Sequence, residues 1–234
     1  MAKVTGLRAG IIMKKVSKTR IVMCIFAIAP LILVAFMYNR LPDQIPTNWG
    51  FNGEISYGSK TTLWWLSGMS PILAVMFMFL PRIDPRKKNY EKFRGLYDGF
   101  ALFMMVFMLG LIALIISESL NPGKISVELV IVAACGLLFV FIGNMMPKVK
   151  SNFFVGIKTP WALSNTEVWN KTHRLGGYLF FFGGLLTIVM TFFLREYALF
   201  ITLMVIVAVM VIVPAVMSYV WYKKLKNEHT SEAH

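Results

Sequence analysis

The sequence predicts an all-α integral membrane protein with six transmembrane helices, both chain ends in the cytoplasm, and a short amphipathic helix in the cytoplasmic loop before helix five. Composition is the first observation behind this prediction. Of the 234 residues, 57% are hydrophobic and only 15% are charged, and the mean hydropathy is +0.66. A soluble domain carries about 25% charged residues, so the composition excludes an ordinary soluble fold.

Six long apolar blocks are the second observation. Each is at least 17 residues long, the length needed to cross a hydrocarbon core about 30 Å thick. Apart from Glu128 at the start of the fourth block, none contains a charged residue or a histidine. Only Arg195 and Glu196 separate the last two blocks, and a charged pair is costly within the membrane, so these blocks predict a tight helical hairpin. The expected spans cover residues 21–38, 62–80, 99–117, 127–143, 178–194 and 197–222.

The distribution of Lys and Arg is the third observation. Of the 24 basic residues, 20 lie in the N-terminal segment, the second and fourth loops and the C-terminal tail, and 4 lie in the other loops. The positive-inside rule places the richer set in the cytoplasm. The net charge of +13 is therefore expected to orient the protein and to attract anionic membrane lipid, with no direct binding of nucleic acid.

Sequence features of several other protein classes are missing. The block at residues 21–38 lacks a signal-peptide cleavage pattern and is expected to remain as the first helix, while residues 1–12 are expected to be an upstream extension. Cys24 and Cys135 lie inside spans and the three histidines are scattered, which leaves no disulfide or metal-ligand pattern. No catalytic or cofactor-binding motif is recognised, so we expect neither an enzyme nor a cofactor.

The chain is expected to divide into an N-terminal helical hairpin with a structured extracellular loop (residues 21–80) and a four-helix domain (residues 99–222) with a cytoplasmic signature loop (residues 144–177). In the extracellular loop two prolines favour extended backbone, and Asn52-Gly53 is a strong turn signal. We expect a compact loop, anchored by its aromatic residues at the outer headgroups or in contact with a ligand.

The signature loop carries the most information. Ser164 and Glu167 have the spacing of a capping box, so a helix is expected to begin near Asn165. This helix is expected to be amphipathic, to lie along the inner interface or lead into the fifth span, and to hold His173 as a hydrogen-bonded interfacial residue. Residues 153–157 form an apolar run that is expected to dip into the membrane or plug the bundle. The helical repeat is formed by Trp169, Thr172, His173 and Gly176.

These loop residues resemble the signature of the SdpI/YfhL family of membrane immunity proteins. The matching residues are Gly143, Asn144, Met146, Pro147, Lys148, Lys150, Asn152, Phe154, Gly156, Ile157, Thr159, Pro160, Trp161, Leu163, Trp169, Thr172, His173, Gly176 and Gly177. Lys158, within the same run, is a further candidate functional residue. The first loop resembles the small domain of unknown function that often precedes this signature, through Leu41, Pro42, Ile45, Pro46, Trp49, Gly53, Glu54, Gly58 and Lys60. Asn48 stands where that pattern usually has His.

The resemblance implies a multi-pass protein of the bacterial cytoplasmic membrane that protects its cell from a secreted killing peptide, that is, bacteriocin immunity. It implies a secreted antimicrobial peptide toxin and membrane lipid as partners. A cytoplasmic repressor, held at the membrane when toxin is bound, is a further implied partner. The six-span fold derived from the apolar blocks is also the fold that this family implies.

Two other functions remain open on the residues alone. A transporter or flippase-like carrier would place a polar cavity near the midplane, with candidate lining residues Ser67, Ser70, Asn144, Thr187 and Thr191. A membrane enzyme would need convergent titratable groups, for which the nearest set is Lys150, Lys158, Glu167 and His173. A solid apolar bundle would favour a binding and sensing protein over both.

Overall fold

The computed structural model describes residues 18–50 and 54–232. Six of its helices are long and apolar enough to cross a membrane, which confirms the predicted six-span, all-α fold. The expected extension at residues 1–12, the Asn52-Gly53 turn and the candidate Gly53 lie outside the described residues. The six helices are α1 (Lys18–Met37), α2 (Thr62–Ile83), α4 (Arg94–Leu120), α5 (Val127–Met145), α7 (Thr166–Phe193) and α8 (Glu196–Glu232).

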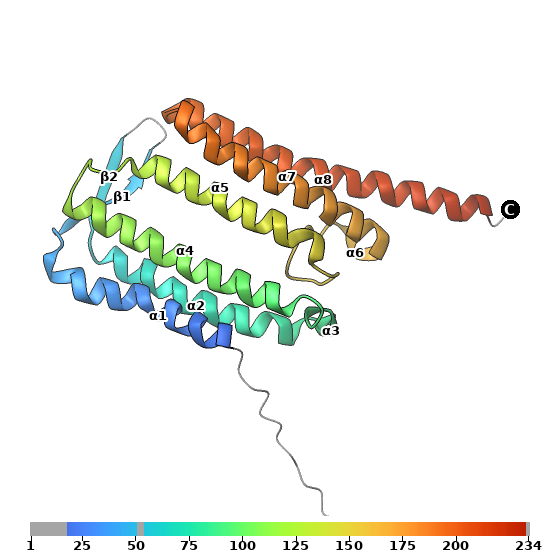
Figure 1. The fold of residues 1–234 in the computed structure, drawn as a ribbon, viewed down its shortest axis with the longest axis horizontal. Coiled ribbons are helices and arrows are strands. Elements are labelled where there is room, and N and C mark those ends of the chain that lie inside the picture. Colours follow the sequence, from blue (N-terminus) through green and yellow to red (C-terminus); the bar gives the residue numbers. More distant parts are fainter. Residues whose placement is uncertain (1–17, 51–53, 233–234) are drawn as a thin grey trace, which may run out of the picture.

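Short elements close the two ends of the bundle (Figure 1). One end carries an antiparallel hairpin of two strands, preceded by a single 3-10 turn. The opposite end carries the connections between α2 and α4 and between α5 and α7. These elements are η1 (Tyr38–Arg40), β1 (Gln44–Trp49), β2 (Ile55–Ser59), α3 (Lys87–Tyr90), η2 (Met146–Lys148) and α6 (Pro160–Ser164).

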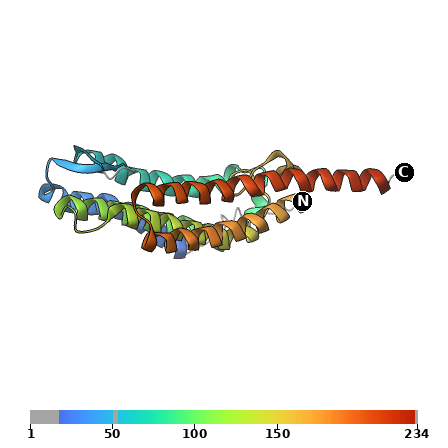
Figure 2. The ribbon, with the colours of Figure 1, turned by 90° about the horizontal axis from the view of Figure 1, so that it is seen from above.

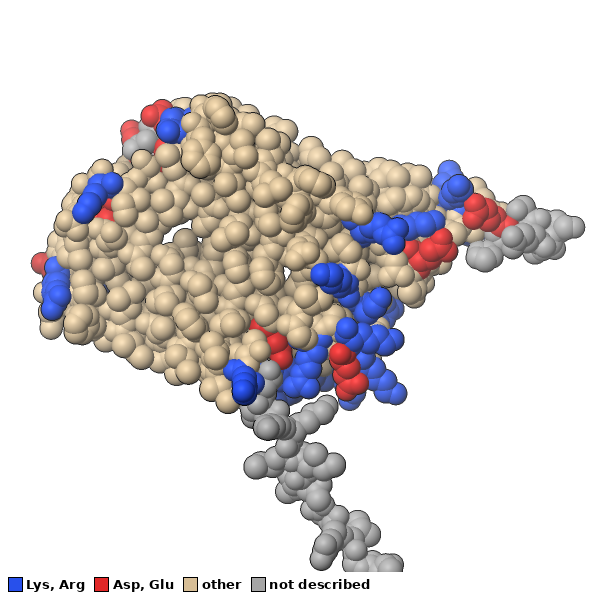
Figure 3. All heavy atoms as spheres, in the orientation of Figure 1, with Lys and Arg blue, Asp and Glu red and all other residues tan. Residues whose placement is uncertain are grey.

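The six long helices pack as two groups of three. Helices α1, α2 and α4 contact one another, and α7 contacts both α5 and α8 (Figures 1 and 2). Between the groups, α4 meets α5 through Phe141, which stacks on Phe103 at 4.7 Å between ring centroids. Figure 3 shows gaps between the spheres midway along the molecule. The division at residues 21–80 and 99–222 stays a prediction.

Glycines bring α5 and α7 into close contact. A Cβ built on Gly143 would overlap the backbone of Phe181, and one on Gly177 would lie 2.6 Å from Pro147 Cγ. Farther along the same helices, a Cβ on Gly184 would lie 2.5 Å from the Gly136 carbonyl oxygen. Small residues let membrane helices approach backbone to backbone, so the close approach of α5 and α7 depends on the absence of a Cβ at these glycines.

The outer surface has the distribution expected of a membrane protein. Apolar side chains point outward along the spans, among them Trp65 at 82% exposed and Phe192 at 74% exposed. In Figure 3 a wide belt without charge covers the middle of the molecule, and Lys and Arg gather at the end where α3 and α6 lie. We call this the basic end, and the opposite one the hairpin end.

Several helices extend beyond the predicted spans into polar sequence. Helix α4 begins at Arg94 and not near residue 99, α7 begins at Thr166 and not near residue 178, and α8 continues to Glu232. The short amphipathic helix expected before the fifth span is therefore the first part of α7 itself. Apolar blocks mark only the hydrocarbon core, whereas helices continue wherever packing and capping support their polar turns.

Candidate functional site

Most of the residues that matched the family signature lie in a folded segment at the basic end, which we call the cap (residues 146–165). It connects α5 to α7 and contains η2 and α6 (Figure 1). Two of its polar side chains are buried, Ser151 at 8% exposed and Asn152 at 0% exposed. Buried polar groups need hydrogen-bond partners, and these partners come from three other parts of the chain.

Asp84, at the end of α2, is the first of these partners. Its carboxylate is buried and accepts the backbone N–H of Arg86 at 2.6 Å and that of Phe153 at 2.8 Å. The Tyr90 hydroxyl lies 3.2 Å from Asp84 Oδ2. Burial, followed by the nearby Asp84 carboxylate, raises the pKa of Tyr90 well above its ordinary value. Tyr90 is therefore a neutral donor that ties the α2–α4 connection together.

Asn152 shapes the turn that follows it. Its side-chain oxygen accepts the backbone N–H groups of Phe154 at 2.9 Å and Val155 at 2.6 Å. Its side-chain nitrogen donates to the carbonyl oxygens of Lys150 at 2.9 Å and Val155 at 3.0 Å. The Tyr90 hydroxyl also lies 3.2 Å from the Asn152 oxygen. An Asn in this role mimics a backbone turn, so the apolar run at residues 153–157 folds back on the bundle.

Arg86 and Asn89 hold the cap from the same side. The Arg86 guanidinium donates to the Ser151 hydroxyl and, at 3.0 Å, to the Leu163 carbonyl oxygen. The Asn89 side chain donates to the Ser151 carbonyl oxygen at 2.7 Å. Guanidinium groups suit this role because their planar fork offers five donors. The α2–α4 connection thus joins the first helix group to the cap of the second.

His173 packs directly against the backbone of Gly156. His173 Nδ1 lies 2.9 Å from the Trp169 carbonyl oxygen, which can only accept, so this nitrogen carries the proton. Nε2 then accepts the Ile157 backbone N–H at 3.1 Å. Gly156 has φ +111°, and a Cβ built on it would overlap Nε2. Only glycine suits the position of Gly156. The two hydrogen bonds of His173 match a neutral imidazole that carries its proton on Nδ1.

Trp169 and Thr159 tie the cap to α7 and α8. The buried Trp169 indole donates to the Val149 carbonyl oxygen at 2.9 Å and stacks on His173 with ring centroids 3.9 Å apart. The Thr159 hydroxyl accepts the Ala162 backbone N–H at 3.1 Å, which caps α6, and lies 2.8 Å from the Ser218 hydroxyl of α8. One face of the first turns of α7, with Trp169 and His173, is thereby buried against the cap, while Glu167 and Lys171 lie on the exposed face.

The capping box expected from Ser164 and Glu167 is wrong, although the helix does begin where it was expected. Asn165 is the N-cap of α7, and its side chain accepts the backbone N–H groups of Glu167 at 2.7 Å and Val168 at 3.1 Å. Ser164 instead donates to the Trp161 carbonyl oxygen at 3.0 Å. Asn ranks with Ser as an N-cap residue, so the sequence contained both candidates one position apart.

The remaining signature residues separate into a buried and an exposed set. Thr172 and Gly176 are buried in α7, and a Cβ on Gly176 would lie 2.5 Å from Ile157 Cδ1. Trp161 is half-buried, with its ring centroid 5.0 Å from that of Tyr219. The exposed set, which forms the free surface of the cap and its flanks, is Asn144, Pro147, Lys150, Lys158 and Pro160.

Several of the residues proposed for a carrier or an enzyme have other partners. Ser67 and Thr187 donate to carbonyl oxygens of their own helices, at 3.2 Å and 2.8 Å. Ser70 donates to Met105 Sδ, across to α4. Glu167 pairs with Lys171 at 2.8 Å on an exposed face of α7, away from the backbone partners of His173. These contacts account for the side chains through helix packing.

At the hairpin end, the first-loop residues form a second candidate surface. Ile45 is fully buried in β1, Pro46 pairs with Tyr57, and Trp49 pairs with Ile55. Pro42 and Glu54 are exposed. Trp49 also borders a cleft of about 220 Å³ between the hairpin and helices α5 and α8. The cleft is lined mainly by apolar side chains, including Ile131, Val132, Leu199, Phe200 and Leu203.

Asp84, Arg86 and Tyr90 were not predicted as site residues. The signal in the sequence was weak: one acidic residue followed by Pro85 within a loop rich in Lys and Arg. The bond from Asn89 to Ser151 shows that this loop contacts a segment more than 60 residues away. Nothing in the spacing of the sequence indicated this contact.

Two family models match parts of this chain, and one known protein matches nearly its whole length. Residues 148–218 match the SdpI/YfhL protein family, and residues 25–70 match a domain of unknown function, DUF1648. The chain is 26% identical over 215 residues to a protein from Bacillus subtilis (strain 168) named "Immunity protein SdpI", covering 92% of this chain and 99% of that protein. No solved structure matches the chain. The chain therefore carries an SdpI/YfhL family segment that contains most of the cap, preceded by a DUF1648 segment that contains the hairpin.

Proposed function

We propose that this chain is a bacteriocin immunity protein of the cytoplasmic membrane, which protects its cell from a secreted, membrane-active peptide. The observation that carries the proposal is the end-to-end similarity to an immunity protein, over 92% of this chain. The fold supports it, because a bundle of six spans places binding surfaces at both sides of the membrane and within it.

The hairpin end is the surface that we propose for toxin contact. Under the predicted orientation it faces outward, where a secreted peptide arrives. Its cleft combines Trp49 with apolar side chains of α5 and α8, and concave apolar surfaces with an aromatic residue are common peptide-binding sites. The toxin would cover this cleft and the adjoining outer ends of the helices.

The cap is the part that we propose to respond to the toxin. The two helix groups are connected at the basic end by the bonds of Asp84, Arg86 and Asn89 to the cap. A peptide that binds one arrangement of the groups more tightly shifts the protein toward that arrangement. Movement of one group against the other would then change the surface of the cap.

Signal transduction is the finer part of the proposal. The exposed residues of the cap, among them Lys150 and Lys158, form a basic surface on the side that the positive-inside rule assigns to the cytoplasm. A cytoplasmic repressor with an acidic face would dock on this surface when toxin is bound. This would hold the repressor at the membrane and away from DNA.

Expression of the chain in a toxin-sensitive bacterium tests the immunity proposal. We expect cells with the chain in their membrane to survive a cognate killing peptide that kills cells with an empty vector. The variant Trp49→Ala should lose protection while keeping its membrane level, and Trp65→Ala, which changes an 82% exposed residue of α2, is the matched control. Killing of wild-type-expressing cells, with the protein present in the membrane, would contradict the proposal.

The repressor is tested separately, with a fluorescent fusion of a candidate repressor in the same cells. Addition of the peptide should move the fusion to the membrane in the wild type. The double variant Lys150→Glu, Lys158→Glu should leave it in the cytoplasm while survival is kept. Recruitment that is unaffected by the double variant would exclude the cap as the docking surface, without affecting the immunity proposal.

A further inference from the structure

A pocket of about 510 Å³ lies at the basic end, apart from the cap. It is formed by the end of α2, the short helix α3 and the first turns of α1 and α4. Five cationic side chains and one acidic side chain line it, namely Arg20, Arg82, Lys87, Lys88, Arg94 and Glu91. Like charges gathered this closely repel one another, so an anion bound among them would be stabilised.

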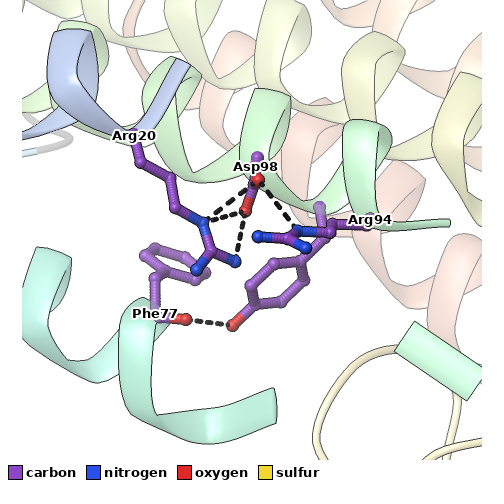
Figure 4. Close-up of polar contacts among 5 residues, drawn as sticks. Arg20, Phe77, Arg94 and Asp98 are labelled. Atoms are coloured by element: carbon purple, nitrogen blue, oxygen red, sulfur yellow. Dashed lines mark hydrogen bonds and ion pairs between the residues drawn. The ribbon is translucent and has the colours of Figure 1, made fainter. Parts of the chain in front are cut away.

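Asp98 organises two of these cations. It is 6% exposed and accepts hydrogen bonds from Arg20 Nε at 3.0 Å and Arg20 Nη2 at 2.9 Å. Arg94 Nε forms an ion pair with it at 3.8 Å. Figure 4 shows the two guanidinium groups on either side of this carboxylate. Because a guanidinium has five N–H donors, Arg20 and Arg94 keep donors for a second anion. The five cations face two carboxylates, those of Glu91 and Asp98, which leaves an excess of three positive charges.

Two packed tyrosine side chains form part of the wall of the pocket. The Tyr97 hydroxyl donates to the Phe77 carbonyl oxygen at 2.9 Å, and the Tyr90 and Tyr97 rings pack edge to face at 5.4 Å. Both rings line the pocket beside Pro81. A fixed wall lowers the entropy cost of binding, so the pocket is prepared for a ligand before the ligand arrives.

The position of the pocket favours a lipid over a soluble anion. Arg20, Arg82 and Arg94 lie near the ends of helices that are long and apolar enough to cross a membrane, and lipid headgroups surround the ends of such helices. Ile21 and Ile83, next in sequence to Arg20 and Arg82, are 52% and 63% exposed, so apolar surface borders the cationic rim. Basic pockets between spans in this position bind the phosphates of anionic lipids.

We propose that this pocket is a specific binding site for the phosphate headgroup of an anionic phospholipid such as phosphatidylglycerol. Lys87, Lys88 and Arg82 contact the phosphate, and Arg20 and Arg94, positioned by Asp98, complete the cationic ring. The acyl chains lie along the exposed apolar faces of α1 and α2. The site does not depend on the immunity function.

Native mass spectrometry of the detergent-purified full chain, titrated with dioleoyl phosphatidylglycerol, tests the proposal. Dioleoyl phosphatidylcholine serves as the neutral reference with the same acyl chains. We expect roughly tenfold tighter binding of phosphatidylglycerol, and roughly tenfold weaker binding of it by Lys87→Gln, Lys88→Gln. The matched control is Lys223→Gln, Lys224→Gln, which removes the same charge from exposed positions of α8 and should leave the affinity unchanged.

Each other outcome overturns the proposal. Equal affinity for the two lipids would show that the headgroup charge is not recognised, and an equal loss in the α8 control would show attraction by net charge alone. Displacement of the lipid by millimolar inorganic phosphate would assign the pocket to a soluble anion. If the double variant does not fold, Arg82→Gln, which changes one exposed rim residue, takes its place with the same expected direction.

Discussion

Asp84 Oδ2 accepts the backbone N–H of Phe153 at 2.8 Å, across 69 residues of sequence. This bond joins the end of α2, in the first helix group, to the cap between α5 and α7. The Tyr90 hydroxyl and the Arg86 backbone N–H bind the same carboxylate. One buried acidic group therefore holds three donors in place.

Replacement of Asp84 by Ala should lower the stability of the whole protein. Loss of the buried carboxylate leaves the part-buried N–H of Phe153 without its acceptor, and such a loss costs about 1–3 kcal/mol. We expect a clear decrease in the thermal unfolding midpoint of the purified protein in detergent. Asp43→Ala is the control, because the Asp43 side chain is 94% exposed, and it should leave the midpoint nearly unchanged.

The raised pKa of Tyr90 predicts a loss of stability in alkali. Burial and the Asp84 carboxylate raise the pKa in the folded protein above the ordinary 10.0, so the neutral hydroxyl contributes stability that is complete below pH 10. This contribution falls as the pH rises above 10, because the unfolded chain then releases the proton more readily. Between about pH 9 and pH 11, wild-type protein should lose more stability than Tyr90→Phe. Equal slopes in the two unfolding profiles would contradict the prediction.

The contact between Gly156 and His173 predicts a non-additive pair of substitutions. Gly156→Ala introduces a Cβ that overlaps His173 Nε2, at a backbone φ of +111°, and should destabilise the protein by a few kcal/mol. His173→Ala removes the imidazole and leaves the Ile157 N–H unpaired. The double variant should be more stable than the two single losses added together, because the overlap is gone. A double-mutant cycle of unfolding free energies measures the difference, and additive losses would show that the overlap is relieved by backbone movement.

The α5–α7 contact predicts that substitution of two different glycines by Ala changes the stability of the protein to very different extents. Gly143→Ala places a methyl group against the Phe181 backbone and should separate the helices, with a cost of about 1–3 kcal/mol. Gly110→Ala is the matched control, because a Cβ there meets nothing within 4 Å. We expect lower expression and a lower unfolding midpoint for the first variant only, measured by fluorescence-detected chromatography after heating.

Sequence reasoning succeeded for structural features that one type of residue determines. Charge and apolar length located all six spans, since a charged group rarely enters the hydrocarbon core, and the motif in residues 144–177 located the cap. It failed where partners are distant in sequence. The bonds of Asp84 and Arg86 to the cap depend on how the helix groups pack, and the choice of Asn165 over Ser164 as N-cap depends on one residue of register.

The predicted orientation of the bundle rests on the positive-inside rule, and cysteine labelling in intact cells tests it. Ser151 is buried and bonded to Arg86, so a cysteine there would react poorly on either side. Lys150→Cys and Asn48→Cys are better probes, because both positions are exposed and they lie at opposite ends of the bundle.

With Cys24 and Cys135 replaced by Ala, an impermeant maleimide should label the variant at residue 48 in intact cells. The variant at residue 150 should be labelled only after the cells are broken. Labelling at residue 150 in intact cells would invert the topology, and the cap would then face the outside, where no cytoplasmic repressor could reach it.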